Sequence, residues 1–141
     1  MASNPLLGTW KLKSYVVTGA SGERSMLYGE SPKGYVHYGT DGRMQVIGVA
    51  DNRIIPTGPT PPDQERIALY DTMFAYAGTY SVGAGRVTHH VDLSWNEVWT
   101  GTDQVRTFEV NGNSLTLTMR LVDSESRGET RYVAVWEKVA G

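Results

Sequence analysis

The sequence predicts an all-β protein: a single antiparallel up-and-down β-barrel of eight or nine strands, with one short helix near residues 61–75. Three observations predict this fold. The 141 residues suit one domain, residues 1–141. Short segments that alternate apolar and polar residues are separated at short intervals by turn residues, as in an antiparallel meander. One helix cannot cover so many strands, so the strands must close on themselves to bury their apolar faces.

Nine segments have the alternation and the flanking turn residues of strands. They are residues 8–18, 24–28, 34–38, 43–49, 77–82, 86–94, 104–110, 114–121 and 130–138. Glycine-rich and asparagine-rich turns separate them, such as Asp41-Gly42, Asn111-Gly112-Asn113 and Ser126-Arg127-Gly128. Because side chains alternate across a strand, the apolar parity of each segment identifies the face that points into the barrel.

The segment after the proline-rich loop predicts the single helix. Thr60 would be its N-cap and Pro61 its first residue, and the helix would continue to about Ala75. Its apolar residues recur every three or four positions and predict one buried stripe: Ile67, Tyr70, Met73 and Phe74. We expect this helix to lie across one mouth of the barrel or against its wall.

The inward faces combine apolar, aromatic and thioether side chains. Strand by strand they are Trp10, Leu12, Ser14 and Val16; Val36 and Tyr38; Met44 and Val46; Tyr76, Gly78, Tyr80 and Val82; Val87, His89, Val91 and Leu93; Gln104, Arg106, Phe108 and Val110; and Leu115, Leu117 and Met119. Both faces of the last strand are apolar, and we prefer Tyr132 and Trp136 inward.

Two polar residues, His89 and Arg106, interrupt this apolar interior. An unpaired buried guanidinium is costly, so Arg106 needs a side-chain acceptor or a ligand oxygen as its partner. A neutral imidazole can move a proton near pH 7, and the phenol of Tyr80 can donate to a developing oxyanion. The alternative is that His89 and Arg106 only buttress the barrel through hydrogen bonds.

Several kinds of site and partner are not expected. Adjacent strand residues face opposite sides, so His89 and His90 cannot chelate one metal, and with no cysteine we expect no metal site. The turn Gly83-Ala84-Gly85 joins two strands, so no nucleotide cofactor is expected. Without a Gly-x-Ser-x-Gly elbow, Ser-His-Asp catalysis is not expected either.

Charge and hydropathy predict a cytoplasmic protein. The net charge is −2, and Lys and Arg are scattered singly apart from Lys11 and Lys13, so nucleic acid is not an expected partner. No stretch approaches the ~20 apolar residues of a membrane span, and residues 1–7 lack the features of a signal peptide. The absence of cysteine is typical of the reducing cytosol. We expect a monomer or a homodimer with no membrane partner.

Several sequence motifs, beginning with Gly8-Thr9-Trp10, resemble those of one known family. The segments are LLGTWKL at 6–12, YGTDGRM at 38–44, YAGTY at 76–80, HHV at 89–91 and WTGTDQVR at 99–106. Together they resemble the calycin-like, bacterial and fungal lipocalin-like domain family. The resemblance implies an antiparallel barrel with a ligand cavity, and related barrels act as cyclases or isomerases in natural-product pathways.

The resemblance also implies a cation late in the last strand. Lipocalins generally place an arginine there, against the Trp of the first strand, whereas this chain has Lys138. Lysine lacks the flat guanidinium that stacks on an indole. We therefore expect closure at Trp10 to depend more on apolar contact than on a stacked cation.

Three functions remain open. The leading hypothesis is that the barrel binds a small, mostly hydrophobic molecule with a polar or acidic group. The alternative is a cofactor-free cyclase or isomerase acting on a polyketide-like or terpenoid-like intermediate, with His89, Arg106 and Tyr80 as catalytic residues. The third is a structural or partner-binding module. The candidate ligand-binding residues are Tyr38, Met44, Tyr76, Tyr80, His89, Trp99, Arg106, Phe108, Leu117, Met119 and Tyr132.

Overall fold

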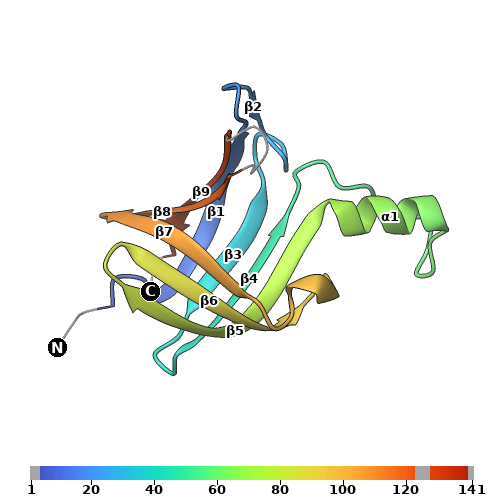
Figure 1. Ribbon diagram of the computed structural model, residues 1–141. Coiled ribbons are helices and arrows are strands. Elements are labelled where there is room, and N and C mark those ends of the chain that lie inside the picture. The colour runs from blue at the N-terminus through green and yellow to red at the C-terminus, as the bar shows by residue number, and fades with distance from the viewer. Residues whose placement is uncertain (1–3, 123–127, 140–141) are drawn as a thin grey trace.

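Strands β1 and β9 pair with each other and close one antiparallel sheet into a barrel (Figure 1). The computed structural model describes residues 4–122 and 128–139, so the predicted turn at Ser126 and Arg127 lies outside the described residues. Within them the sheet order is β2-β1-β3-β4-β5-β6-β7-β8-β9. The strands are β1 (Gly8–Thr18), β2 (Arg24–Ser25), β3 (Lys33–Tyr38), β4 (Arg43–Val49), β5 (Met73–Gly83), β6 (Arg86–Ser94), β7 (Asp103–Asn111), β8 (Ser114–Val122) and β9 (Glu129–Lys138). The predicted all-β barrel is confirmed, although the second strand ends at Ser25 rather than at Tyr28.

Two β-bulges change which side chains face the interior. Lys13 is an extra residue in β1 opposite β9, and beyond it Tyr15 rather than Ser14 or Val16 lines the interior. Asp92 is an extra residue in β6, so Leu93, expected inside, is 67% exposed. A bulge shifts the alternation by one position, which turns every later side chain to the opposite face.

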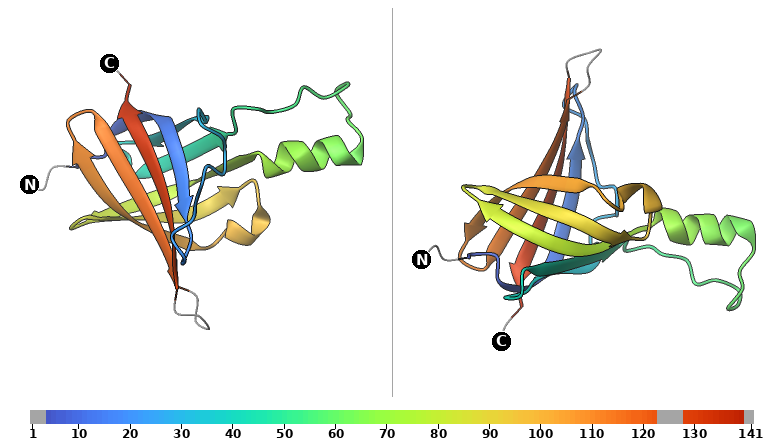
Figure 2. Two further views of the ribbon diagram at one scale, coloured as in Figure 1. Left: turned by 90° about the horizontal axis from the view of Figure 1, so that it is seen from above. Right: turned by 60° about the horizontal axis from the view of Figure 1, so that its bottom comes forward.

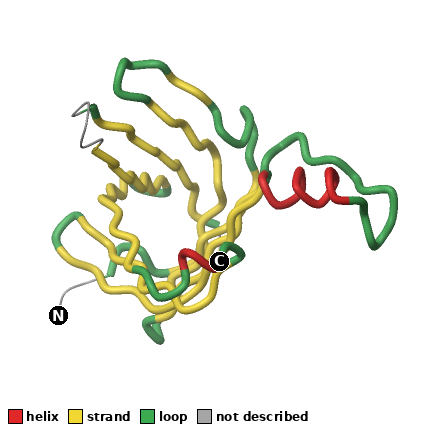
Figure 3. The backbone as a smooth tube through the Cα atoms, turned by 45° about the vertical axis from the view of Figure 1, so that its right-hand side comes forward, coloured by secondary structure: helices red, strands yellow, loops and turns green. Residues whose placement is uncertain are grey.

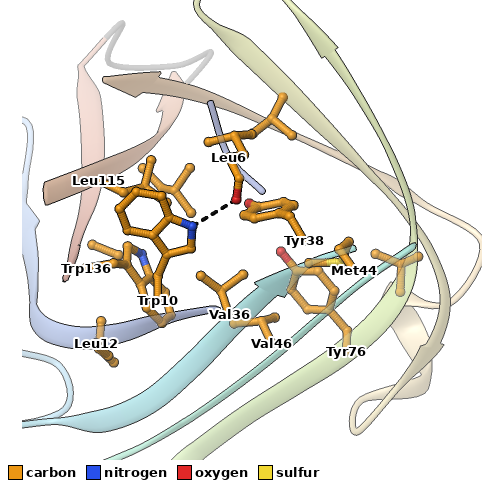
Figure 4. Close-up of a cluster of buried hydrophobic side chains, with 14 residues drawn as sticks. Leu6, Trp10, Leu12, Val36, Tyr38, Met44, Val46, Tyr76, Leu115 and Trp136 are labelled. Carbon is orange, nitrogen blue, oxygen red and sulfur yellow. Dashed lines mark hydrogen bonds between the residues drawn. The ribbon is translucent and has the colours of Figure 1, made fainter. Parts of the chain in front are cut away.

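One end of the barrel is filled by a packed core around Trp10 (Figure 4). The indole Nε1 of Trp10 donates a hydrogen bond to the carbonyl of Leu6 at 2.9 Å. Lys138 lies with its ammonium 4.7 Å from the centre of the Trp10 ring and donates to the carbonyl of Leu7. A cation therefore does lie over the Trp10 ring, beside extensive apolar packing, and the expectation that closure depends more on apolar contact stays a prediction. Gly8 has φ +113°, and a Cβ there would overlap Lys138, which explains glycine at the start of this motif.

The helix is shorter than predicted and does not cover the barrel. Helix α1 (Asp63–Asp71) begins after the N-cap Pro62, which makes no side-chain capping bond, and not at Pro61. Met73 and Phe74 belong to β5, so the periodicity that predicted a helix to Ala75 joined residues from two elements. Figure 2 shows α1 projecting away from the barrel, and none of its residues is buried. No helix within the described part of the chain is long and apolar enough to cross a membrane.

Candidate functional site

The interior beyond the packed core contains a cavity of about 290 Å³. Its wall is formed by Tyr15, Leu27, Tyr28, Val36, Val46, Phe74, Tyr76, His89, Trp95, Trp99, Arg106, Leu117, Met119, Leu121, Tyr132, Ala134 and Trp136. None of these residues is an Asp, Glu, Asn, Gln, Ser or Thr. The wall is therefore aromatic and aliphatic, and its polar groups are tyrosine hydroxyls, indoles, one imidazole and one guanidinium.

Arg106 is the cationic residue of this wall. Strand β7 turns it inward with the even-numbered residues, as the alternation predicted. Its Nη1 donates to the backbone carbonyl of Val105 at 3.1 Å and lies 3.5 Å from the side-chain oxygen of Gln104. Its charge partly offsets the rise that burial causes in the pKa of Tyr76. No carboxylate of the described residues forms a salt bridge with it. Because arginine remains protonated in proteins, the cavity holds a positive charge that has no carboxylate counter-ion among the described residues.

His89, on β6, is held between a tyrosine of β3 and a tyrosine of β5. Its Nε2 lies 2.7 Å from the hydroxyl of Tyr38 on β3, and its Nδ1 lies 2.6 Å from the hydroxyl of Tyr76 on β5. Burial lowers the pKa of His89 to about 3, and the Arg106 guanidinium acts in the same direction. Burial also raises the pKa of Tyr38 and of Tyr76. At neutral pH the three rings are therefore uncharged, and both imidazole nitrogens are already hydrogen-bonded.

The described residues leave two indole N–H groups of the cavity wall without a hydrogen-bond partner. They belong to Trp95 and Trp136, and both nitrogens are buried. An indole nitrogen is a donor only, and a buried donor without an acceptor costs about 1–3 kcal/mol. Neighbouring atoms cover both nitrogens, so a molecule in the cavity does not contact them in this arrangement.

The structure brings seven of the predicted ligand-binding residues to the cavity and leaves four away from it. Those at the cavity are Tyr76, His89, Trp99, Arg106, Leu117, Met119 and Tyr132. Those elsewhere are Tyr38, Met44, Tyr80 and Phe108, of which Tyr38 and Met44 lie in the packed core. The hydroxyl of Tyr80 accepts from Asn4 at 2.9 Å and donates to the carbonyl of Gly39 at 2.7 Å. Tyr80 therefore does not meet His89 and Arg106 in the cavity.

Aromatic residues that the sequence interpretation did not select complete the cavity. Tyr15 and Phe74 pack against Tyr28, with ring centres 5.1 Å and 5.2 Å from it. Trp95 lies beside Trp99, with ring centres 5.7 Å apart. The high count of tyrosine and tryptophan was the available signal, but a bulge hid Tyr15, and Tyr28 and Trp95 lie outside the strands.

A hydrogen-bonded chain of Ser81, His90 and Asp103 lies on the outer surface, although no such arrangement was expected. The hydroxyl of Ser81 lies 2.7 Å from Nε2 of His90, and Nδ1 of His90 lies 2.8 Å from Asp103. These residues belong to the adjacent strands β5, β6 and β7 and do not line the barrel cavity. We interpret these hydrogen bonds as a surface network that links the three strands. As predicted, His89 and His90 face opposite sides of the sheet.

A closed antiparallel barrel with an aromatic cavity defines a class of small proteins that can hold one ligand inside the barrel. The chain matches the family model of the lipocalin-like domain over residues 7–139. It therefore belongs to the lipocalin-like family, which confirms the resemblance of its sequence motifs. No curated protein shows significant sequence similarity to the chain.

Proposed function

We propose that the protein binds a small, flat, mostly apolar anion, such as an aromatic carboxylate or an enolate, inside the barrel. The observation that carries this proposal is Arg106, a cation in an aromatic cavity to whose wall residues 4–122 and 128–139 contribute no carboxylate. A ligand anion would supply the missing counter-ion. Charge-assisted hydrogen bonds of this kind are about twice as strong as neutral ones.

The size and the donors of the cavity narrow the ligand class. A volume of about 290 Å³ is at the lower end of ligand pockets, so the ligand is small. Tyr76 and Trp99 are stacked with an interplanar angle of 29°, and flat ligands pack well against such rings. The donors at the cavity are the Arg106 guanidinium and the tyrosine hydroxyls, which favour a ligand with oxygen acceptors.

Tyr76 is the second proposed contact to the anion. Tyr38 is fully buried away from the cavity, so its hydroxyl has His89 Nε2 as its acceptor and donates its hydrogen bond there. The Nδ1–H of His89 then donates to the oxygen of Tyr76. The Tyr76 proton is then free to donate to a ligand beside Arg106, which lines the same cavity.

Binding fits the geometry better than proton-transfer catalysis by His89. A general base works best with a pKa near the working pH, whereas burial holds the pKa of His89 at about 3. Both of its nitrogens are bonded to tyrosines, so neither can reach a substrate directly. The cyclase or isomerase hypothesis and the cytoplasmic location remain predictions.

A calorimetric titration with naphthoate, compared with its neutral alcohol analogue, tests the proposal. Naphthoate should bind more tightly than the alcohol, and Arg106→Met should remove that preference. Loss of a charge-assisted bond costs about 1.5–3 kcal/mol, or about 10-fold to 150-fold in Kd. The control Arg86→Met removes an exposed arginine outside the cavity and should not change Kd. Equal naphthoate affinity in the wild type and Arg106→Met would contradict the proposal.

A further inference from the structure

Residues 51–72 form an arm that leaves the barrel between β4 and β5. It consists of the proline-rich loop and α1, and it extends away from the barrel in every view (Figures 1–3). Hydrogen bonds tie the arm together. Arg53 donates to the carbonyl of Leu69 at 2.9 Å and to the hydroxyl of Thr72 at 3.2 Å, and the Thr57 N–H donates to Glu65 at 3.0 Å. The arm is therefore a braced element with a defined direction.

The arm exposes large apolar side chains to solvent, although exposed surface elements usually carry polar ones. Ile55 is 93% exposed and Ile67 is 60% exposed, and the nine residues of α1 include no buried one. Isolated helices of this length are marginal in water, and most helix stability in proteins comes from packing an apolar face. The barrel supplies little of that packing, chiefly the contact of Tyr70 with Trp95.

An open groove of about 790 Å³ on the outer surface of β3, β4 and β5 provides a matching surface. It is lined mainly by apolar and aromatic side chains, including Tyr35, Ile47, Ala75, Leu93 and Trp95. About half or more of the surface of Tyr35, Ile47 and Leu93 is exposed. Exposed apolar patches of this kind mark interaction sites.

The charges at the arm and beside the groove are complementary. Lys11 pairs directly opposite Tyr35, and Lys33 shares the outward face of β3 with it. Neither lysine forms a salt bridge with any described carboxylate. On the arm, Glu65 and Asp71 form no salt bridge with any described cation. Docking of α1 at the groove would bring carboxylates of the arm close to free ammonium groups.

We propose that α1 of one copy docks in the outer groove of a second copy, and that the exchange is reciprocal, giving a two-fold homodimer. Each chain carries both halves of the contact, which is what a closed two-fold interface requires. In its own chain the arm meets the edge of the groove through the contact of Tyr70 with Trp95. The rest of the arm, which is braced at its root by Arg53, extends away from the barrel (Figure 2). The homodimer buries Ile67 and Leu93 on both copies.

Sedimentation equilibrium of the full chain tests this interface. The wild type should show twice the chain mass of 15.5 kDa. Ile67→Glu on the arm and Leu93→Glu in the groove should each raise the dimer dissociation constant at least about 10-fold, because each buries a carboxylate in an apolar contact. Both positions are exposed in the single chain, so the fold should be retained, as circular dichroism would verify. Val105→Glu, at an exposed position of β7 outside the groove, is the matched control.

Cross-linking then identifies the contact itself. Since the chain has no cysteine, Ile67→Cys and Leu93→Cys each introduce a unique thiol. Mixing the two single variants with a short bis-maleimide should give a cross-linked species of twice the chain mass, and Val105→Cys mixed with Ile67→Cys should not. A wild type that is monomeric at all concentrations would overturn the proposal. A dimer whose dissociation constant is unchanged by both glutamate substitutions would also overturn it. The same holds if the double variant Ile67→Cys/Leu93→Cys cross-links within one chain while the mixed single variants do not cross-link.

Discussion

Replacing His89 by glutamine should remove a large part of the acid sensitivity of the fold. The imidazole is buried between Tyr38 and Tyr76, and this burial lowers its pKa from 6.5 in the unfolded chain to about 3. Between these two values the unfolded chain binds a proton at this position and the folded protein does not. The contribution of the neutral His89 to the free energy of unfolding is therefore fully present above pH 6.5 and is lost as the pH falls toward 3.

The size of the effect follows from the two pKa values. Each pH unit in this window changes the free energy of unfolding by about 1.4 kcal/mol, because the unfolded chain holds one more proton. Allowing for partial protonation at pH 7, the loss at pH 4 is about 3 kcal/mol. This is a large fraction of the stability of a typical domain.

Urea unfolding followed by tryptophan fluorescence at pH 7, 6, 5 and 4 measures the slope. The carboxylates contribute to the wild-type slope as well, so the difference between the wild type and His89→Gln isolates the imidazole. Glutamine can still bond to both tyrosines but does not titrate. His37→Gln, at an exposed histidine bonded to Thr9, is the control and should keep the wild-type slope. Parallel pH profiles for the wild type and His89→Gln would refute the argument.

Two further substitutions test the backbone and the barrel closure. Gly78→Ala places a Cβ where it overlaps the carbonyl oxygen of His90, so the backbone must shift. We expect this shift to lower the free energy of unfolding by about 1–3 kcal/mol, measured by urea unfolding. An unchanged unfolding midpoint would contradict this expectation. Lys138→Met removes the cation over the Trp10 ring and should lower the unfolding free energy by about 1 kcal/mol, whereas Lys138→Arg should keep most of it. If both Lys138 variants are equally stable, the cation contributes nothing to closure.

Strand alternation was sufficient to predict where His89 and Arg106 point. Each lies in a strand stretch that keeps strict parity, so local sequence determines the face. The same reasoning failed at Leu93 and Tyr15, which follow the bulges at Asp92 and Lys13. A bulge depends on how two strands pair across the sheet, and one strand's own sequence does not reveal it.

The composition of the cavity wall could be predicted only in part, because it combines strand faces with residues outside the strands. Tyr28 follows the short strand β2, and Trp95 lies between β6 and η1 (Glu97–Trp99). Their positions depend on the closed barrel, which brings them to the same space as Phe74. The prediction of a buried helix failed for a related reason: Ile67 and Tyr70 are spaced as a buried stripe, but the barrel covers only part of Tyr70, through Trp95, and leaves Ile67 60% exposed.

His89 was singled out as a possible proton carrier, and its surroundings argue for a positioning role instead. An imidazole with one tyrosine on each nitrogen fixes the rotation of both hydroxyls. When the Nδ1–H of His89 donates to the oxygen of Tyr76, the Tyr76 proton is left to be donated to a third group. The cavity is the place where such a group can lie, because Tyr76 and Arg106 both line it. A buried, neutral histidine and an arginine that forms no salt bridge with a described carboxylate therefore both support the proposed anionic ligand.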